Sequence, residues 1–102
     1  MEYHAILVLI HVFLIKLFNE GVDFLRDEDY EKALNYFMSA IENGSSGEEI
    51  AEAYNYIGII FQNGLGVNED KKKAFEYFQT AAEMGSWRGA EHLALKYYWD
   101  YG

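Results

Sequence analysis

The chain has 102 residues, of which 51% are apolar and 18% aromatic. One small domain of this composition can bury a core, which excludes a disordered acidic tail. It has no Cys, which excludes disulfides, thiolate metal sites and cysteine nucleophiles. Its net charge of −9 argues against direct binding to nucleic acid or an anionic membrane.

The N-terminal segment is an apolar run, in which residues 5–15 hold a single polar residue, His11. A membrane-spanning helix needs about 20 such residues, so the run is too short. It also lacks the positively charged start and the small-residue cleavage site of a secretory leader. We therefore predict that residues 1–16 form a buried helix of a cytoplasmic protein. The alternative is an exported or membrane-tethered protein in which residues 1–16 act as a signal.

Helical periodicity begins after this segment, since apolar residues recur at spacings of three and four. An acidic turn at residues 27–29 separates the first two helices. Further helices are predicted at about 48–62, 70–84 and 87–101. Their predicted boundary residues are Asn43-Gly44, Ser45 or Ser46, Asn63-Gly64, Asn68 or Asp70, Gly85 and Ser86.

Two stretches of the chain repeat. Gly21-x-x-Phe24 recurs as Gly58-x-x-Phe61, and Ala33-x-x-Tyr36-Phe37-x-x-Ala40 recurs as Ala74-x-x-Tyr77-Phe78-x-x-Ala81. Small residues at such positions let neighbouring antiparallel helices approach closely, and the aromatic residues fill the space between them. The pattern predicts an array of helical hairpins.

These motifs resemble tetratricopeptide repeats in the first hairpin and Sel1-like repeats over residues 53–85. The likeness extends over about residues 14–99, with Gly89 standing where a Sel1-like repeat usually has Ala. It implies an all-α fold, a short right-handed α–α hairpin solenoid with an extra apolar N-terminal helix. In one domain of residues 1–102, we expect an N-terminal segment at 1–16, hairpins at 17–44 and 48–85, and a half-repeat helix at 86–102.

The residues that could carry chemistry are scattered. The three histidines, His4, His11 and His92, have no metal-binding spacing, and the glycine-rich stretches do not continue as phosphate-binding loops. The acidic residues are numerous, but no feature of the sequence indicates that any two of them act as an acid–base pair. We expect no catalytic residue, no metal and no cofactor.

The resemblance implies binding of other proteins on a concave face lined by the first helix of each hairpin. On this chain the expected contact residues are Asn55, Ile59, Gln62, Glu91, Leu95, Tyr98 and Trp99. We expect a protein or peptide partner that is apolar or basic, contacted by aromatic anchors within an acidic rim. Phe18 and Val22 also fall on this face, but packing within the array is the favoured interpretation for both.

Two other functions remain open. Nine acidic against two basic residues in 18–50 would suit an inhibitor that occupies a basic, nucleic-acid-binding surface of a target enzyme. Alternatively, the apolar ends pair with copies of themselves and make a homo-oligomer. For that assembly the candidate interface residues are Leu9, Val12 and Phe13.

Overall fold

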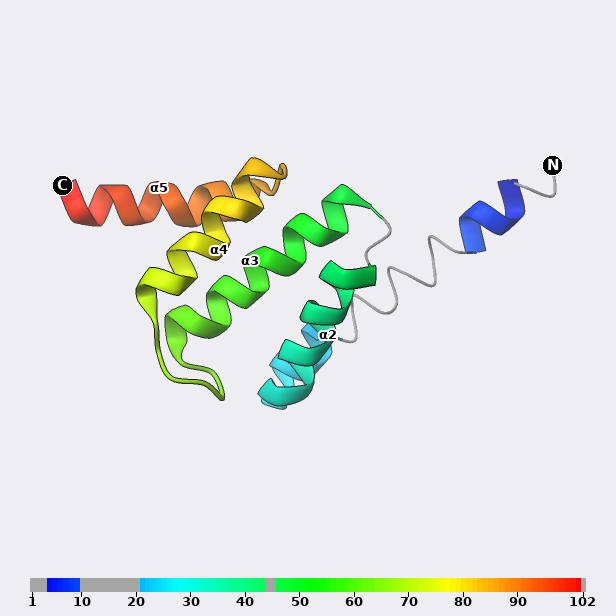
Figure 1. Cartoon of the computed structure of the whole chain (residues 1–102), viewed down its shortest axis with the longest axis horizontal. Coiled ribbons are helices and arrows are strands. Elements are labelled where there is room, and N and C mark those ends of the chain that lie inside the picture. The colour runs from blue at the N-terminus through cyan, green and yellow to red at the C-terminus, as the bar shows by residue number, and fades with distance from the viewer. Residues whose placement is uncertain (1–3, 10–20, 44–45, 102) are drawn as a thin grey trace.

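The computed structural model describes residues 4–9, 21–43 and 46–101, with the backbone alone for 99–101. Every regular element in these ranges is a helix, which confirms the all-α fold (Figure 1). Residues 4–9 and 21–26 are helical, followed by α2 (Tyr30–Asn43), α3 (Gly47–Asn63), α4 (Lys71–Glu83) and α5 (Trp87–Tyr101). The predicted residues Gly44 and Ser45 lie outside the described ranges.

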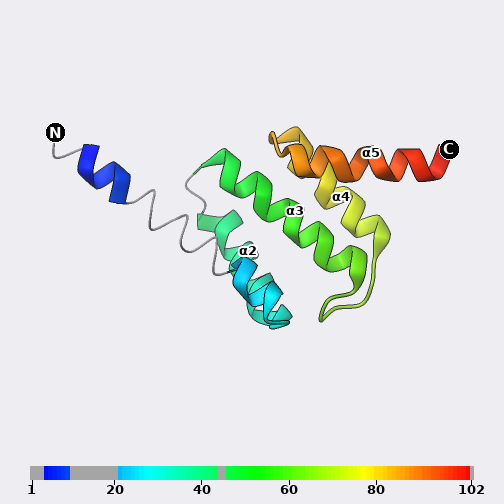
Figure 2. The same ribbon diagram turned by 180° about the vertical axis from the view of Figure 1, so that it is seen from behind.

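The helices pack as successive hairpins. The helix at 21–26 turns back into α2, α3 turns back into α4, and α5 packs on α4 (Figures 1 and 2). Among the labelled helices, α3 is the central one, since it contacts α2, α4 and α5. Each helix thus contacts mainly its neighbours along the chain, as in a helical solenoid.

Side-chain caps fix where the two central helices, α3 and α4, begin. The Ser46 side chain accepts a hydrogen bond from the Glu49 N–H at 3.2 Å, and Asp70 accepts one from the Lys73 N–H at 2.9 Å. α3 ends at Gly64, whose φ of 62° lies in the left-handed region that glycine adopts without strain. Of the paired candidates, Ser46 rather than Ser45 and Asp70 rather than Asn68 are the caps in the described residues.

The repeated glycines are explained by one recurring contact. A Cβ built on Gly58 would lie 2.5 Å from Cε1 of Phe78, and one on Gly21 would lie 2.9 Å from Cε1 of Phe37. In each hairpin, glycine on the first helix therefore lets the aromatic ring of the second helix lie against the backbone. The sequence repeat is a repeat of this packing.

Stacked aromatic rings join helices both between hairpins and within one. Phe37 of α2 stacks on Tyr56 of α3 at 5.1 Å between centroids, and Phe61 of α3 stacks on Tyr77 of α4 at 5.7 Å. Such pairs stabilise by about 0.5–1.5 kcal/mol beyond their buried area. The core cluster consists of Ala33, Phe37, Ala53, Ile57, Ile60, Phe61, Ala74 and Phe78.

The N-terminal helix differs from the prediction. Ile6, Leu7, Val8 and Leu9 are 48–67% exposed, so the predicted burial is wrong for these residues. A run that is apolar on all sides has no face that selects one packing partner, and no described element covers it. Within the described ranges, no helix combines the length and the apolar character needed to cross a bilayer.

Candidate functional site

A groove lies where α3 and α5 separate. Their N-terminal ends are close together and their C-terminal ends are apart, with α4 beside both (Figures 1 and 2). The groove holds a cavity of about 430 Å³, a size typical of ligand pockets. It is lined by Gln62 of α3, by Lys71, Ala74, Phe75 and Phe78 of α4, and by His92, Leu95 and Lys96 of α5.

Polar contacts hold the start of α5 against α3. Ser86 Oγ donates to Glu52 Oε1 at 2.7 Å and accepts from the Gly89 N–H at 3.1 Å, so one hydroxyl both caps α5 and joins it to α3. Arg88 Nη1 donates to Glu52 Oε2 at 3.2 Å. Glu52 therefore bridges two groups at the N-terminus of α5.

A second polar contact lies one turn further along both helices. The Asn55 side chain is completely buried, and its Oδ1 lies 2.9 Å from His92 Nδ1. The imidazole also stacks on Phe78, with 4.5 Å between ring centroids. Asn55 Nδ2 has no hydrogen-bond partner among the described residues. These contacts fix the His92 ring in the wall of the groove.

Gly89 brings α5 against α4. A Cβ there would lie 2.7 Å from Ala81 Cβ and 3.1 Å from the Phe78 carbonyl oxygen. The glycine in place of the usual alanine of Sel1-like repeats therefore permits a closer approach of the two helices. This approach forms one side of the groove.

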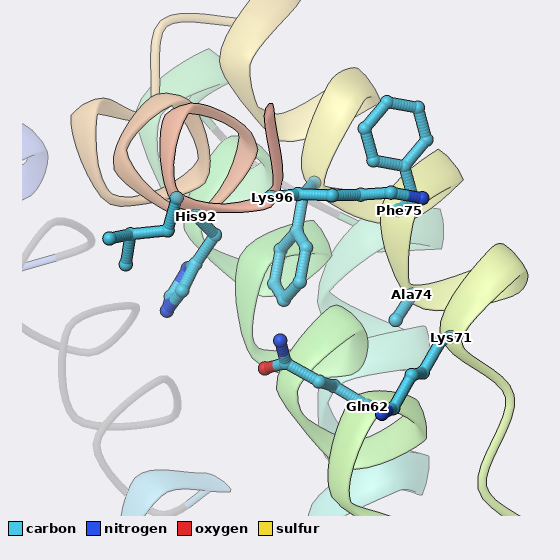
Figure 3. Close-up of a pocket in the computed structure, with 8 residues that line it drawn as sticks. Gln62, Lys71, Ala74, Phe75, His92 and Lys96 are labelled. Carbon is cyan, nitrogen blue, oxygen red and sulfur yellow. The ribbon is translucent and has the colours of Figure 1, made fainter. Parts of the chain in front are cut away.

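A lysine lies at each end of the groove. Figure 3 shows Gln62 and Lys71 at one end and Phe75, His92 and Lys96 at the other. Lys96 extends from α5 to Phe75, where its Nζ lies 4.0 Å from the ring centroid. Lys71 Nζ lies 3.7 Å from Glu69 Oε1, an exposed pair. None of the lining residues is acidic.

The comparison with protein families identifies the array. The Sel1 repeat model matches residues 17–45 and 51–86, which together make up more than half of the chain. The chain belongs to the Sel1 repeat family. The tetratricopeptide-like first hairpin thus matches the Sel1 model as well. No curated protein and no solved structure matches the chain significantly.

Sel1 repeats generally mediate protein–protein interactions. Of the predicted contact residues, Gln62 and Leu95 line the groove, and Leu95 is 49% exposed. Ile59 is half-buried, and Asn55 lies behind the groove, where it supports His92. Glu91 and Tyr98 are exposed on α5 but do not line the cavity, and the Trp99 side chain lies outside the described residues.

The sequence analysis did not predict the residues of α4, the second helix of the Sel1 hairpin, that form the floor of the groove. It assigned the face to the first helix of each hairpin, whereas Phe75, Phe78 and Lys71 come from α4. Phe75 follows the repeated Ala74 directly and lines the cavity together with it, but Phe75 is not itself a position of the sequence repeat. The spacing of His92 and Lys96, one helical turn apart on α5, was the available indication of a shared face.

The remaining site predictions concern the N-terminus and metals. Leu9 is exposed, while Val12 and Phe13 lie outside the described residues. In the described ranges no three His, Asp or Glu side chains lie together as a metal site would require.

Proposed function

We propose that this Sel1 repeat protein is a non-catalytic interaction module that binds a protein segment in the groove between α3 and α5. The observation that carries the proposal is the cavity of about 430 Å³, to which three helices of successive repeats contribute side chains. Its apolar lining residues, among them Phe75 and the half-exposed Leu95, offer the surface on which a partner's side chain gains binding energy.

The test selects ligands from random sequences, so that the natural partner need not be known. A phage-displayed library of random peptides of about 12 residues, long enough when extended to cross three helices, is selected against the full chain. Binding of the recovered peptides is then measured by fluorescence anisotropy for the wild type, Leu95→Ser and Trp87→Ser. Trp87 is the matched control because it is a large exposed apolar residue on α5 outside the groove lining.

A groove ligand should bind Leu95→Ser about tenfold more weakly, because a central apolar contact is lost, and Trp87→Ser within about twofold of wild type. Peptides that bind both variants as tightly as wild type would bind elsewhere and contradict the proposal. The same conclusion follows if selection yields no peptide that binds the wild type.

Self-assembly is a second candidate, favoured by the exposed apolar side chains of residues 6–9. Leu7 and Leu9 are 65% and 67% exposed, which is unusual for an apolar cluster in a monomer. Light scattering over a concentration series should show a mass that rises with concentration for wild type and stays monomeric for Leu9→Lys. A wild type that is monomeric throughout would exclude assembly through this segment.

A further inference from the structure

The charged residues that line the groove are all basic, although the protein as a whole is acidic. The chain carries 17 acidic and 8 basic residues, yet the groove lining holds two lysines and no carboxylate. At physiological salt the Debye length is about 8 Å, so charges on distant surfaces are largely screened. A ligand group inside the groove therefore responds to Lys71 and Lys96 more than to the net charge of the chain.

The position of Lys71 adds to this potential. It opens α4, where three consecutive lysines occupy the first turn with no acidic residue among them. The N-terminus of a helix carries partial positive charge, so cations there destabilise the helix by a few tenths of a kcal/mol or more. The lysines are thus unfavourable for the helix dipole, and the carboxylate of the cap residue Asp70 offsets one of the three positive charges.

Neither groove lysine is neutralised by a buried partner. Lys71 pairs with Glu69 at 3.7 Å, with both side chains more than half exposed. Exposed pairs of this kind contribute about 0–1 kcal/mol, so a ligand carboxylate can compete with Glu69. Lys96 lies over the Phe75 ring at 4.0 Å, which leaves its ammonium protons available to an oxygen acceptor.

From this arrangement we infer that the groove selects a peptide segment in which an apolar side chain is adjacent to an acidic one. The apolar side chain enters the cavity against Phe75, Phe78 and Leu95, and the carboxylate pairs with Lys96 or Lys71 at the groove ends. This inference rests on the proposed function and specifies its partner. It differs from the expectation of a basic partner, because a basic side chain in the groove would meet two lysines.

The test uses the peptides recovered from the random library. We expect an Asp or Glu within two positions of an aromatic or aliphatic residue in most of them. Their affinity should fall about tenfold for Lys96→Glu and stay within about twofold for Lys72→Glu. Lys72 makes a matched control, because it is an exposed lysine outside the groove lining and the charge change is the same. Affinity should also fall as salt is raised from about 50 to about 500 mM.

The outcomes separate this inference from the proposed function. Some peptides could bind Leu95→Ser more weakly than wild type and yet lack acidic residues, or bind Lys96→Glu as tightly as wild type. Such peptides would contradict the preference for an acidic side chain but support binding in the groove. Peptides that are rich in Lys and Arg and bind in the groove overturn that preference too. Peptides indifferent to Leu95→Ser overturn both proposals. Equal weakening by Lys96→Glu and Lys72→Glu indicates long-range repulsion, and overturns the specific pairing in the groove.

Discussion

Asn55 and His92 join the buried middle of α3 to α5, with 2.9 Å between Asn55 Oδ1 and His92 Nδ1. The joint between α3 and α4 is of another kind, since it consists of apolar and aromatic contacts such as Phe61 on Tyr77. Apolar packing tolerates small shifts, whereas a hydrogen bond fixes distance and direction. The angle at which α5 leaves α3, and so the width of the groove, depends on these polar side chains together with the close approach of α5 to α4 at Gly89.

Replacement of Asn55 should therefore cost stability although the residue touches no ligand. Asn55→Ala removes a buried hydrogen bond and leaves a small cavity, and we expect a loss of about 1–3 kcal/mol in the free energy of unfolding. Urea denaturation followed by circular dichroism measures it. Asn35→Ala, at an exposed position of α2, is the control and should stay within about 0.5 kcal/mol of wild type.

The hydrogen bond itself is tested by a double-mutant cycle. Asn55→Ala, His92→Ala and the double variant should show a coupling energy of about 1 kcal/mol, because each single change removes the same interaction. Additive effects of the two changes would contradict a stabilising Asn55–His92 bond.

Gly58 should not tolerate a methyl group. The new Cβ in Gly58→Ala would lie 2.5 Å from Phe78 Cε1, so the ring and α4 must move, at an expected cost of about 1–3 kcal/mol. Gly47→Ala is the matched control, also on α3, where the new Cβ meets nothing within 4 Å. It should be neutral or stabilising, because alanine is the better helix former. A lower melting temperature for Gly58→Ala alone is the expected result, and equal melting temperatures would contradict the close contact.

Asp70 should stabilise α4 through its cap. Asp70→Ala removes the acceptor for the Lys73 N–H and a negative charge at the helix N-terminus, and we expect a loss of about 1 kcal/mol. Asn68→Ala, in the exposed loop before the cap, should change stability by less than about 0.5 kcal/mol. A larger loss of stability for Asn68→Ala than for Asp70→Ala would show that Asn68, and not Asp70, caps the helix.

The helix ends could be predicted from the sequence and the groove could not, because the first depend on local contacts and the second on distant ones. Capping is local, since Ser46 and Asp70 act on a backbone N–H three residues away, and a sequence motif therefore reveals it. The groove depends on the angle between α3 and α5, and hence on contacts 34 to 37 residues apart in sequence, such as Ser86 with Glu52 and His92 with Asn55. Spacing along the chain carries no information about such pairs.

Tyr77 should make stability fall at high pH. Burial, with smaller effects from Tyr54 and Glu76, raises the pKa of Tyr77 above the ordinary value of about 10. The folded state then holds the phenol proton more tightly than the unfolded state does. The stabilising contribution is therefore complete below about pH 10 and is lost as the pH rises through the raised pKa.

The measurement compares wild type, Tyr77→Phe and Tyr98→Phe between about pH 9 and pH 12. Tyr77→Phe keeps the ring that stacks on Phe61 but has no phenol to ionise, so its free energy of unfolding should fall less steeply above about pH 10. Tyr98→Phe, at a residue that is 67% exposed, should follow the wild type. In an absorbance titration of the nine tyrosines, a late-titrating component should disappear in Tyr77→Phe. Its persistence there would show that another phenol holds the raised pKa.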